Sequence, residues 1–576
     1  MRTSSQALKG ILTIKYIYPA GIIAIISLLL LMPAIAIEVK HPQQSILETI
    51  HRIFFSLLFF LIPIAFFYRN IKAYLYLLLI WIVLTPFFLF SIVLFDVTPG
   101  IDLITLVKQT DKGEVAELAS GLLMAVFLGV FILFIFLYWV AVKKFPYRQI
   151  SFGTAIGISI FAVVILAGEF YKKIWVNKEE KKWFYFERYY PQSFLYGLYK
   201  TYTYSKENSI EQSKNFSFHA FKKDPISQRQ IYILVIGESS RYDRWQINGY
   251  PRATSPRLST RENLIVYPDV IAGGYNTATA VPQIITRAEP DNFSLQFKEK
   301  SILSAFKEAG FKTIWLSNQS AREIFTDGTI TAHAKSADFR MFNPYETAYN
   351  EKFNYDEWLL PVLDSVIEND DKNYFIVVHT RGSHWDYSKR YPTNFDYFKP
   401  SGYTQSIYPP TIKKKEAFSN TYDNTIRYAD FIIDSVINIT KKYNVASTVF
   451  FISDHGENLM EHNSVKLIFH TSHTPYTLHI PCFIWLSNEY QKLFPGKKAS
   501  LLNHIQNKIG TENTFYTLLD MANISFPGFD STKSIANPSF KDSKQRVYLR
   551  NKNEGYSYEQ FEEEYDRTYN SEAQKN

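Results

Sequence analysis

Carboxylate and imidazole side chains follow three apolar runs of this 576-residue chain, at points where a strand would end. The segments are Gly237-Glu238-Ser239-Ser240, His379-Thr380-Arg381-Gly382-Ser383-His384 and Ser453-Asp454-His455-Gly456-Glu457. Each group alone has an ordinary interpretation, since a Glu after a strand is usually a helix cap and a lone His is usually structural. Together, carboxylate oxygens and imidazole nitrogens suit zinc or manganese better than calcium. We therefore expect a metal site that includes Glu238, Asp454 and His455.

A glycine-containing loop offers a second kind of chemistry, that of a hydroxyl nucleophile. It reads Gly273-Gly274-Tyr275-Asn276-Thr277-Ala278-Thr279-Ala280-Val281-Pro282 and passes into a helical apolar pattern. A threonine at such a helix start lies beside backbone N–H groups and the positive end of the helix dipole, both suited to a phosphate. Its hydroxyl needs a metal or a base before it can attack. The alternative function of a threonine here is a helix N-cap, and the loop alone does not separate the two.

The elements that must position these groups are short β-branched runs separated by longer helical patterns. The runs are Ile231–Ile236, Lys312–Leu316, Tyr374–Val378, Thr448–Ile452 and Pro481–Leu486. Such an alternation predicts a mostly parallel sheet covered on both faces, in which ligands bind beyond the carboxyl ends of the strands. We expect an α/β domain over residues 229–550, followed by a flexible acidic tail over 551–576.

Five apolar runs within residues 1–171 predict an N-terminal transmembrane domain of five helices. They are Ile17–Ile37, Phe54–Tyr68, Ala73–Phe95, Gly121–Val142 and Ile150–Glu169. A helix needs about 20 mainly apolar residues to cross a bilayer, and the second run is short and contains Pro63. The alternative, five buried helices of a soluble protein, would leave that protein no polar surface in this region.

The charges between the runs predict the orientation of the domain. The basic loops carry Arg2, Lys9 and Lys15, then Arg69 and Lys72, then Lys143, Lys144 and Arg148. They alternate with loops poor in Lys and Arg, so the positive-inside rule places the N-terminus in the cytoplasm and everything after the fifth run outside it. The first run is too long for a cleaved signal peptide and lacks a clear cleavage site, so we expect an anchor.

Residues 172–228 are rich in aromatic side chains that alternate with Lys, Arg and Glu. Tyr and Trp rings settle at the level of lipid headgroups, so we expect bridging helices that lie on the outer membrane face. An aromatic-rich packing helix of the exported domain is the alternative. Because Cys482 is the only cysteine, the exported domain has no internal disulfide.

The motifs in combination resemble those of a known family. They are Val235-Ile236-Gly237-Glu238-Ser239-Ser240-Arg241, Asn248-Gly249-Tyr250, Thr277 with Val281-Pro282, Gly382-Ser383-His384 and Ser453-Asp454-His455-Gly456-Glu457, in this order. The chain resembles the phosphoethanolamine transferases that decorate bacterial lipopolysaccharide, among them the colistin (polymyxin) resistance enzymes, within the alkaline phosphatase and sulfatase superfamily. The resemblance covers nearly the whole chain, and it implies an alkaline phosphatase/sulfatase-type catalytic domain.

The resemblance also implies a ligand set for one or two metal ions, zinc or alternatively manganese. The implied ligands of the catalytic ion are Glu238, Thr277, Asp454 and His455. The residues implied to bind the phosphoryl group or a second metal are His384 and His470. We prefer His470 to His473 because a small residue follows it, as in the family's His-Gly. The secondary candidates are His473, Thr279 and Asn318.

Two threonines compete for the role of nucleophile. By the resemblance, the nucleophile stands four residues before a Val or Leu and nine before a small hydroxyl residue. Thr277 fits this pattern, with Val281 and Thr286 at those positions, whereas Thr279 does not. We therefore predict that Thr277 is the nucleophile.

The chain departs from the lipid A branch of the family in two respects. That branch has several periplasmic disulfides, which one cysteine cannot form, and its nucleophile follows Cys-Gly where this chain has Tyr275-Asn276. Two segments look closer to the core-oligosaccharide branch: Trp315-Leu316-Ser317-Asn318-Gln319, and His384-Trp385-Asp386-Tyr387 through Arg390-Tyr391-Pro392. The acceptor, lipid A or a core sugar, therefore stays open.

The reaction that the resemblance implies is a two-step transfer by a multi-pass protein of the bacterial inner membrane, with its catalytic domain in the periplasm. Thr277 attacks the phosphorus of phosphatidylethanolamine, diacylglycerol leaves, and a lipopolysaccharide group then takes the phosphoethanolamine. We expect membrane lipid around a monomer and no nucleic-acid partner.

Three alternatives compete with this interpretation. One is a lipoteichoic-acid-synthase-like glycerol phosphate transferase. A membrane-bound sulfatase or phosphatase is another, although the chain lacks a Cys or Ser in a Cys/Ser-x-Pro-x-Arg setting. The last is a non-catalytic scaffold, which would be expected to have lost one of the four implied ligands.

Overall fold

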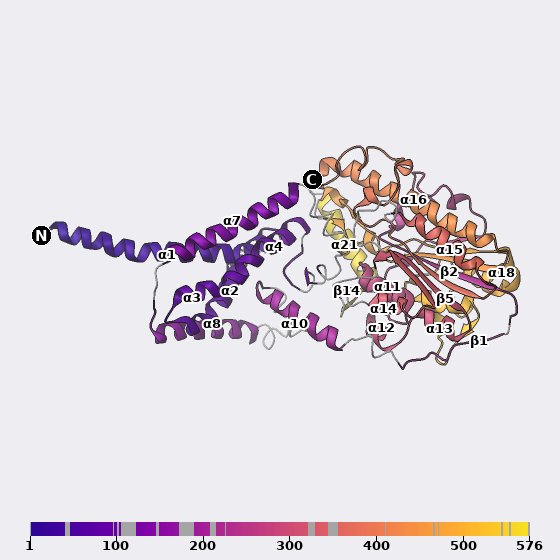
Figure 1. Ribbon diagram of the computed structural model, residues 1–576, viewed down its shortest axis with the longest axis horizontal. Coiled ribbons are helices and arrows are strands. Elements are labelled where there is room, and N and C mark those ends of the chain that lie inside the picture. The colour runs from indigo at the N-terminus through magenta and orange to yellow at the C-terminus, as the bar shows by residue number, and fades with distance from the viewer. Residues whose placement is uncertain are drawn as a thin grey trace. The chain divides into compact units, whose positions relative to one another are not determined.

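The computed structural model describes most of the chain as two compact units (Figure 1). The described residues are 2–40, 46–95, 97–100, 103–104, 107, 122–145, 149–171, 189–207, 215–224, 226–320, 329–343, 355–408, 410–464, 467–470, 472–542, 545–551 and 554–573. The first unit consists of Met1–Lys108 with Leu118–Lys206, and the second of Gln109–Glu117 with Glu207–Asn576.

The first unit is helical. Its helices are α1 (Arg2–Lys40), α2 (Ile46–Leu61), the 3-10 helix η1 (Ile62–Phe67), α3 (Ile71–Leu77), α4 (Leu79–Phe95), α7 (Leu122–Lys144), α8 (Phe152–Tyr171) and α10 (Gln192–Glu207). Four described stretches are long and apolar enough to cross a membrane: Pro19–Lys40, Ile46–Phe67, Ile71–Val93 and Met124–Lys144. We expected five. The apolar stretch Phe152–Gly168 of α8 is shorter than this length.

Local sequence explains the irregular second stretch. Pro63 lacks a backbone N–H, so the α-helical pattern of α2 gives way to the tighter η1 at this point. Together the two elements extend the short apolar run to 22 residues. The Tyr74 hydroxyl donates a hydrogen bond to the Phe60 carbonyl near this break.

Part of the aromatic segment packs against the first unit. The Phe194 ring of α10 lies 4.9 Å from the Phe88 ring of α4, and the Tyr190 ring lies 5.6 Å from the same Phe88 ring. Tyr199 and Tyr202 on the same helix are exposed. Residues 172–188 and 208–214 lie outside the described residues, so the interfacial placement of this segment stays a prediction.

The second unit is built on a seven-stranded mixed sheet. Its strands in spatial order are β3 (Leu264–Tyr267), β11 (Cys482–Leu486), β8 (Ala446–Ser453), β2 (Gln230–Gly237), β7 (Tyr374–His379), β5 (Lys312–Ser320) and β6 (Phe339–Asn343). All five expected runs form strands of this sheet. The strands from β8 to β6 are parallel, whereas β11 is antiparallel to both of its neighbours. Among the described residues between β8 and β11, the longest helix has four residues (Pro475–Leu478), too few for the crossover that a parallel strand needs, so β11 runs back along β8.

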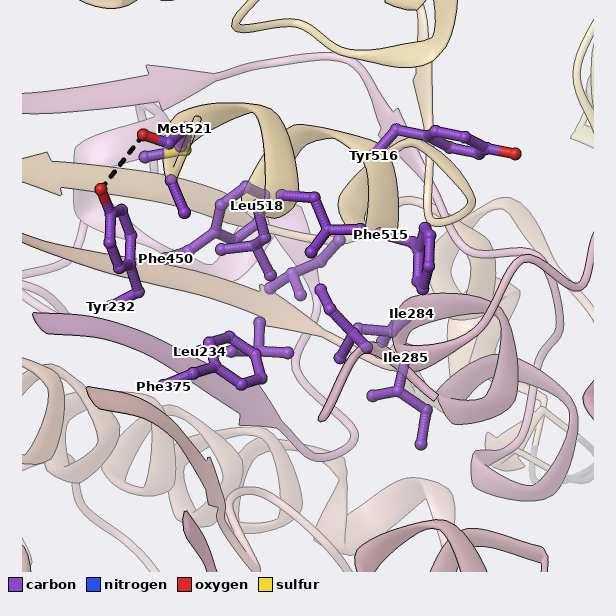
Figure 2. Packing of buried hydrophobic residues seen from close by; sticks show 14 of the residues in the cluster. Tyr232, Leu234, Ile284, Ile285, Phe375, Phe450, Phe515, Tyr516, Leu518 and Met521 are labelled. Atoms are coloured by element: carbon purple, nitrogen blue, oxygen red, sulfur yellow. Dashed lines mark hydrogen bonds between the residues drawn. The ribbon is translucent and has the colours of Figure 1, made fainter. Parts of the chain in front are cut away.

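Helices cover both faces of this sheet because successive strand residues point to opposite sides. Tyr232 and Leu234 of β2 belong to one buried cluster, whereas Ile231 and Ile233 belong to another. The helices beside the first cluster are α11 (Thr277–Ile285), α13 (Ile302–Glu308) and α20 (Asn513–Met521); those beside the second are α15 (Leu359–Glu368) and α16 (Lys415–Lys441). Figure 2 shows the first cluster, where the Tyr232 hydroxyl donates to the Met521 carbonyl at 3.2 Å.

Short elements surround the sheet. The two-stranded pairs are β1 (Phe221–Lys222) with β13 (Ile524–Ser525), β4 (Val270–Ile271) with β12 (Ile509–Gly510), β9 (Asn458–Leu459) with β10 (Ile468–Phe469), and β14 (Val547–Asn551) with β15 (Glu554–Ser557). The remaining helices include α12 (Leu295–Lys298), α14 (Thr329–Ala334), α17 (Pro475–Leu478), α18 (Asn488–Leu493), α19 (Pro495–Asn503) and α21 (Tyr558–Ala573).

The C-terminal segment is a correction to the sequence analysis. We expected a flexible tail over residues 551–576, but Tyr558–Ala573 forms the helix α21. The cause is a ring at every third or fourth position, Tyr558, Phe561 and Tyr565, which gives the acidic helix one apolar face. Phe561 is buried, and its ring lies 5.6 Å from the Tyr548 ring of β14.

Replacing Phe561 with alanine should therefore destabilise the second unit. Removal of a buried ring costs roughly 3 kcal/mol, which a thermal unfolding scan of the purified protein would detect as a lower midpoint. The control is Glu563→Ala on the exposed face of the same helix, which should stay within about 0.5 kcal/mol of wild type. An unchanged midpoint for Phe561→Ala would mean that the segment is a tail after all.

Candidate active site

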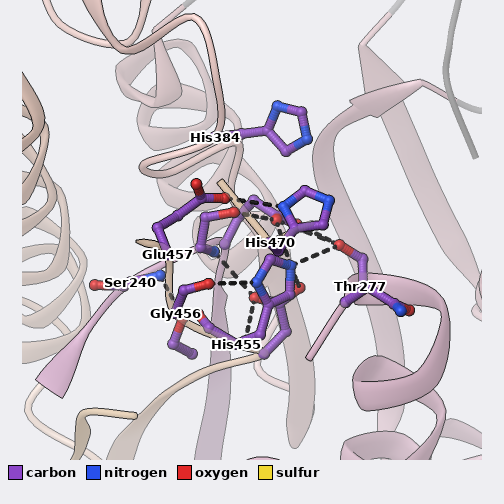
Figure 3. Close-up of polar contacts among 12 residues, drawn as sticks. Ser240, Thr277, His384, His455, Gly456, Glu457 and His470 are labelled. Carbon is purple, nitrogen blue, oxygen red and sulfur yellow. Dashed lines mark hydrogen bonds and ion pairs between the residues drawn. The ribbon is translucent and has the colours of Figure 1, made fainter. Parts of the chain in front are cut away.

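The candidate metal ligands come from two adjacent parallel strands. Glu238 follows β2, and Asp454 and His455 follow β8. Gly237 pairs with Ser453 across these strands, so the side chains that follow them emerge at one edge of the sheet. The structure thus brings the three residues together, as Figure 3 shows for His455 and its neighbours.

The ligand atoms of Glu238, Asp454 and His455 converge within 4.8 Å of one another. His455 Nε2 lies 3.3 Å from Glu238 Oε1 and 3.5 Å from Asp454 Oδ2. All three side chains are buried, and Asp454 Oδ2 is a buried oxygen without a hydrogen-bond partner among the described residues. His455 Nδ1 lies 2.8 Å from the Gly456 carbonyl, an arrangement that places the proton on Nδ1 and turns Nε2 toward the carboxylates. These donors fit a zinc-like cation.

The charges of this cluster also favour a cation. Burial alone would raise the pKa of Glu238, but the hydrogen bond and charge of His455 outweigh it and hold that pKa well below its usual range. Burial and the charge of Glu238 raise the pKa of Asp454 to about 7. Burial opposes a charged imidazole, yet Asp454 and Glu238 raise the pKa of His455 to about 10. The carboxylates therefore attract positive charge, which a divalent cation would supply.

Thr277 lies at the start of α11 and reaches this cluster. Its Oγ1 lies 3.1 Å from Glu238 Oε2 and 3.4 Å from His455 Nε2, and the side chain is partly exposed. The cap of the helix is a different residue, Asn276, whose Oδ1 accepts from the Thr279 N–H at 3.1 Å. The Thr277 hydroxyl is thus not used as a cap and faces the candidate metal ligands.

Thr279 points elsewhere. Its Oγ1 donates to the Asn276 carbonyl at 3.0 Å, and the side chain is buried. A Cβ on Gly274 would lie 2.1 Å from the same Oγ1, which is why the loop needs a glycine there. The structure therefore separates the two threonines in the way that the sequence pattern predicted, although the identity of the nucleophile stays a prediction.

A second group of candidate ligands adjoins the first. It consists of His455, Glu457 and His470, whose ligand atoms also lie within 4.8 Å of one another. His470 Nδ1 is 2.9 Å from Glu457 Oε1, and the His384 ring centroid is 6.0 Å from that of His470 (Figure 3). Burial lowers the pKa of His470, which keeps the imidazole neutral and able to bind a metal.

Glu457 is a candidate that sequence reasoning missed. It lies in the motif after β8 but was not selected as a ligand. Its Oε2 accepts a hydrogen bond from the Tyr387 hydroxyl at 2.7 Å while Oε1 holds His470. No sequence signal separated it from an ordinary loop carboxylate, because the contact that places it is with His470, thirteen residues away.

Two secondary candidates do not belong to the cluster. The His473 ring packs 5.0 Å from the Phe561 ring of α21 and 5.8 Å from the Tyr275 ring, and burial lowers its pKa to about 4. Asn318 is buried and acts at a distance: its Nδ2 donates to Asp356 at 2.8 Å. Asp356 in turn accepts from the N–H groups of residues 381 and 382, which fixes the loop that carries His384.

Two neighbours of Glu238, also missed from sequence, hold its carboxylate in place. Ser239 Oγ donates to Glu238 Oε1 at 2.8 Å. Gln319 Nε2 lies 3.4 Å from Glu238 Oε2 and also donates to the Thr380 carbonyl at 3.1 Å. Both contacts restrict the rotamer of a ligand, which a metal site requires.

Because His470 and His473 lie in different surroundings, we expect their substitution by alanine to have different effects. The resemblance implies that His470 binds the phosphoryl group, so we predict that His470→Ala lowers turnover by about 100-fold. His473→Ala should keep turnover within about threefold and cost roughly 1–2 kcal/mol of stability through lost ring contacts. Initial rates and thermal midpoints of both purified variants test this pair. Equal losses of turnover would mean that both histidines serve the site.

Comparison with known proteins places this site in a family. The family model Sulfatase matches residues 230–524. Phosphoethanolamine transferase EptC of Escherichia coli K12 is 28% identical over 369 residues, which are 61% of this chain and 62% of EptC. Phosphoethanolamine transferase EptA of the same strain is 30% identical over 335 residues, 54% of this chain and 57% of EptA. The chain thus matches less than two thirds of the length of these relatives.

Solved structures show the same architecture. The periplasmic domain of E. coli EptC, crystallised in complex with Zn, matches 59% of this chain and 95% of that domain with a TM-score of 0.53 and 27% identity. The integral membrane protein lipooligosaccharide phosphoethanolamine transferase A from Neisseria meningitidis covers 89% of this chain and 98% of its own, with a TM-score of 0.70 and 21% identity. The latter likeness shows the fold alone.

Proposed function

The chain belongs to the Sulfatase family, and we propose that it transfers phosphoethanolamine from phosphatidylethanolamine to lipopolysaccharide. The resemblance to lipopolysaccharide phosphoethanolamine transferases is confirmed at the level of the family, since relatives with that activity in their names match by sequence. The observation that carries the proposal is Thr277, a free hydroxyl at a helix start that contacts Glu238 and His455. The branch of the family, and with it the acceptor atom, stays a prediction.

The proposed chemistry uses Thr277 as a transient carrier. Its Oγ1 forms a bond to the phosphorus of the donor lipid, the bond from phosphorus to diacylglycerol breaks, and diacylglycerol leaves with the proton that the Thr277 hydroxyl gives up. Glu238 accepts a hydrogen bond from the Thr277 hydroxyl at 3.1 Å and so holds that hydroxyl in position. An acceptor oxygen of lipopolysaccharide then bonds to the same phosphorus, the bond from phosphorus to Thr277 Oγ1 breaks, and the acceptor's proton passes to Oγ1.

We propose that Glu238, Asp454 and His455 hold a zinc ion for this reaction. The support is the convergence of their ligand atoms, the unpartnered oxygen of Asp454 and the Zn complex of the EptC domain. When bound, the ion would lower the pKa of a hydroxyl and stabilise charge on phosphoryl oxygens. A second ion between Glu457 and His470, and manganese in place of zinc, belong to the same proposal.

We further propose a bacterial inner-membrane location with the second unit in the periplasm. Four stretches of the described residues are long and apolar enough to span, and we propose that α8 spans as the fifth. An odd number of spans separates the basic N-terminus from the catalytic unit, as the loop charges require. The expected species is a monomer in lipid, without a nucleic-acid partner.

A reporter fusion tests this topology. A reporter that is active only outside the cytoplasm, attached after Asn576, should give signal, whereas a cytoplasmic reporter at the same place should be silent. The matched fusion after Lys144 should behave in the opposite way, because that residue ends the fourth span on the cytoplasmic side. The reverse pattern would exclude a lipid donor from the outer leaflet.

A donor assay tests the function itself. The purified protein is given phosphatidylethanolamine or phosphatidylglycerol, each with lipopolysaccharide or with water alone as acceptor, and the products are identified by mass. We expect phosphoethanolamine on lipopolysaccharide from the first donor only. Transfer of glycerol phosphate, or release of headgroup to water at the same rate, would replace the proposal with a glycerol phosphate transferase or a hydrolase.

A further inference from the structure

A cavity of about 210 Å³ lies in the second unit, apart from the candidate metal ligands. It is bordered by the 3-10 helix η4 (Tyr242–Arg244), by α17 and His479, and by α21. This volume is below the roughly 300 Å³ of pockets that hold drug-sized ligands, so the occupant would be a small molecule. None of its lining residues belongs to the cluster around His455.

The lining of this cavity has an unusual chemistry. Its aromatic members are Tyr242, Tyr476, Tyr558 and Tyr565, its carboxylates are Asp243, Glu562 and Asp566, and it includes no Lys or Arg. Tyrosine ring faces attract cations, and sites that surround a cation with such faces recognise organic ammonium ions. An anion such as phosphate would be repelled by the three carboxylates and would find no Lys or Arg in the lining.

The charges of the lining add up to a net negative cavity. Asp243 is neutralised by Arg241, whose Nη2 lies 2.6 Å from its Oδ2. Glu562 accepts a hydrogen bond from the Tyr558 hydroxyl at 2.7 Å, and Asp566 is exposed. His479 is stacked on Tyr242 with 4.0 Å between ring centroids, and burial keeps it neutral. Two negative charges on α21 therefore lack a balancing cation in the lining.

The cavity also shares a wall with the candidate active site. A Cβ on Gly456 would lie 2.2 Å from the Tyr476 carbonyl oxygen, so the loop that carries His455 packs directly on α17. Arg241 connects the same regions, since its guanidinium lies 4.3 Å from the centre of the Tyr476 ring and donates to the Glu457 carbonyl at 3.3 Å. A ligand in the cavity would contact the wall that supports the metal-ligand loop.

We propose that this cavity binds a small organic ammonium ion, of which ethanolamine is the example tested, with Tyr565 against the cation and Glu562 and Asp566 balancing its charge. Only the choice of ethanolamine rests on the proposed function. The amine has two possible sources, the free molecule and the headgroup of phosphatidylethanolamine.

The test is calorimetric titration of the full-length protein in detergent with ethanolammonium chloride and with tetramethylammonium chloride, at constant ionic strength. Both should bind saturably, whereas sodium phosphate should not bind to this cavity. The double variant E562Q/D566N should bind both amines about tenfold more weakly. The control E563Q, which removes a charge of the same helix outside the cavity, should bind them as wild type does.

Separate arms identify the source and isolate the cavity from the reaction. Thr277→Ala should bind both amines normally, so loss of transfer and loss of the ammonium site are distinguishable. The binding of free ethanolamine is then compared between nanodiscs of phosphatidylethanolamine and nanodiscs of phosphatidylglycerol. Weaker binding in phosphatidylethanolamine would mean that the lipid headgroup competes for the cavity and is its occupant. Equal binding would identify the soluble amine as the occupant. If neither amine binds saturably, or if E562Q/D566N with a normal thermal midpoint binds them unchanged, the cavity is not an ammonium site.

Discussion

Thr277→Ala should eliminate phosphoethanolamine transfer while leaving the protein folded. The hydroxyl is partly exposed and is not the cap of α11, so its removal leaves the cap of that helix intact. It is the hydroxyl that contacts both Glu238 and His455 within 3.4 Å. Loss of a nucleophile typically lowers turnover by several orders of magnitude. Transfer is measured as the initial rate with a labelled donor lipid. Folding is measured as the midpoint of a thermal unfolding scan.

Thr279→Ala is the matched control. It removes the hydroxyl that donates to the Asn276 carbonyl and should cost on the order of 1 kcal/mol of stability, with transfer largely retained. Peptide mass spectrometry of wild type, supplied with donor lipid and no acceptor, should find phosphoethanolamine on Thr277. Its presence on Thr279, or full activity of Thr277→Ala, would mean that the loop was assigned incorrectly, although the class of reaction would stand.

The parts of the site that the sequence predicted depend on local rules. Glu238, Asp454 and His455 each follow an apolar strand, and parallel strands end at one edge of a sheet whatever packs around them. The choice of Thr277 over Thr279 came from the spacing that the family resemblance implies; in the structure Asn276 and Thr279 form the cap, and the identity of the nucleophile stays a prediction.

The parts that the sequence did not predict depend on contacts between distant segments. The acidic composition of residues 558–573 predicted a flexible tail, although the segment contains the rings of Tyr558, Phe561 and Tyr565. A short helix is stable only when such rings pack against other elements, here β14 and His473. The same contact explains why His473 lies outside the cluster. Glu457 was overlooked for a related reason, because only its partner His470, thirteen residues away, shows that it faces the site.

Asp454→Asn should abolish turnover and metal binding without destabilising the metal-free protein. In wild type, Asp454 Oδ1 accepts hydrogen bonds from the backbone N–H groups of Ser239 at 3.1 Å and of His455 at 2.6 Å. The asparagine side chain keeps an oxygen that can accept both bonds. It replaces only the unpartnered Oδ2 and the negative charge. Burial and the charge of Glu238 raise the pKa of Asp454 to about 7, so above that pH the ionised carboxylate is less favourable in the folded protein than in the unfolded chain. Neutral asparagine removes this cost, and it also removes the attraction of the carboxylate for a charged His455, which acts in the opposite direction. The metal-free midpoint at pH 8 should therefore stay close to that of wild type.

Added zinc should distinguish the Asp454→Asn variant from wild type, whereas the metal-free proteins should not differ in stability. Zinc should raise the thermal midpoint of wild type, because a cation that binds only the folded state stabilises it. For Asp454→Asn this rise should disappear, since loss of a direct ligand weakens binding by far more than the ~10–100-fold expected for an outer partner. The control is Asp430→Asn. Asp430 is a buried carboxylate of α16 that accepts from the backbone N–H groups of Arg257 and Leu258. This variant should keep turnover and the rise of the thermal midpoint with zinc. If Asp454→Asn retains stoichiometric zinc and full turnover, Asp454 is a structural cap of the strand end and the metal site lies elsewhere.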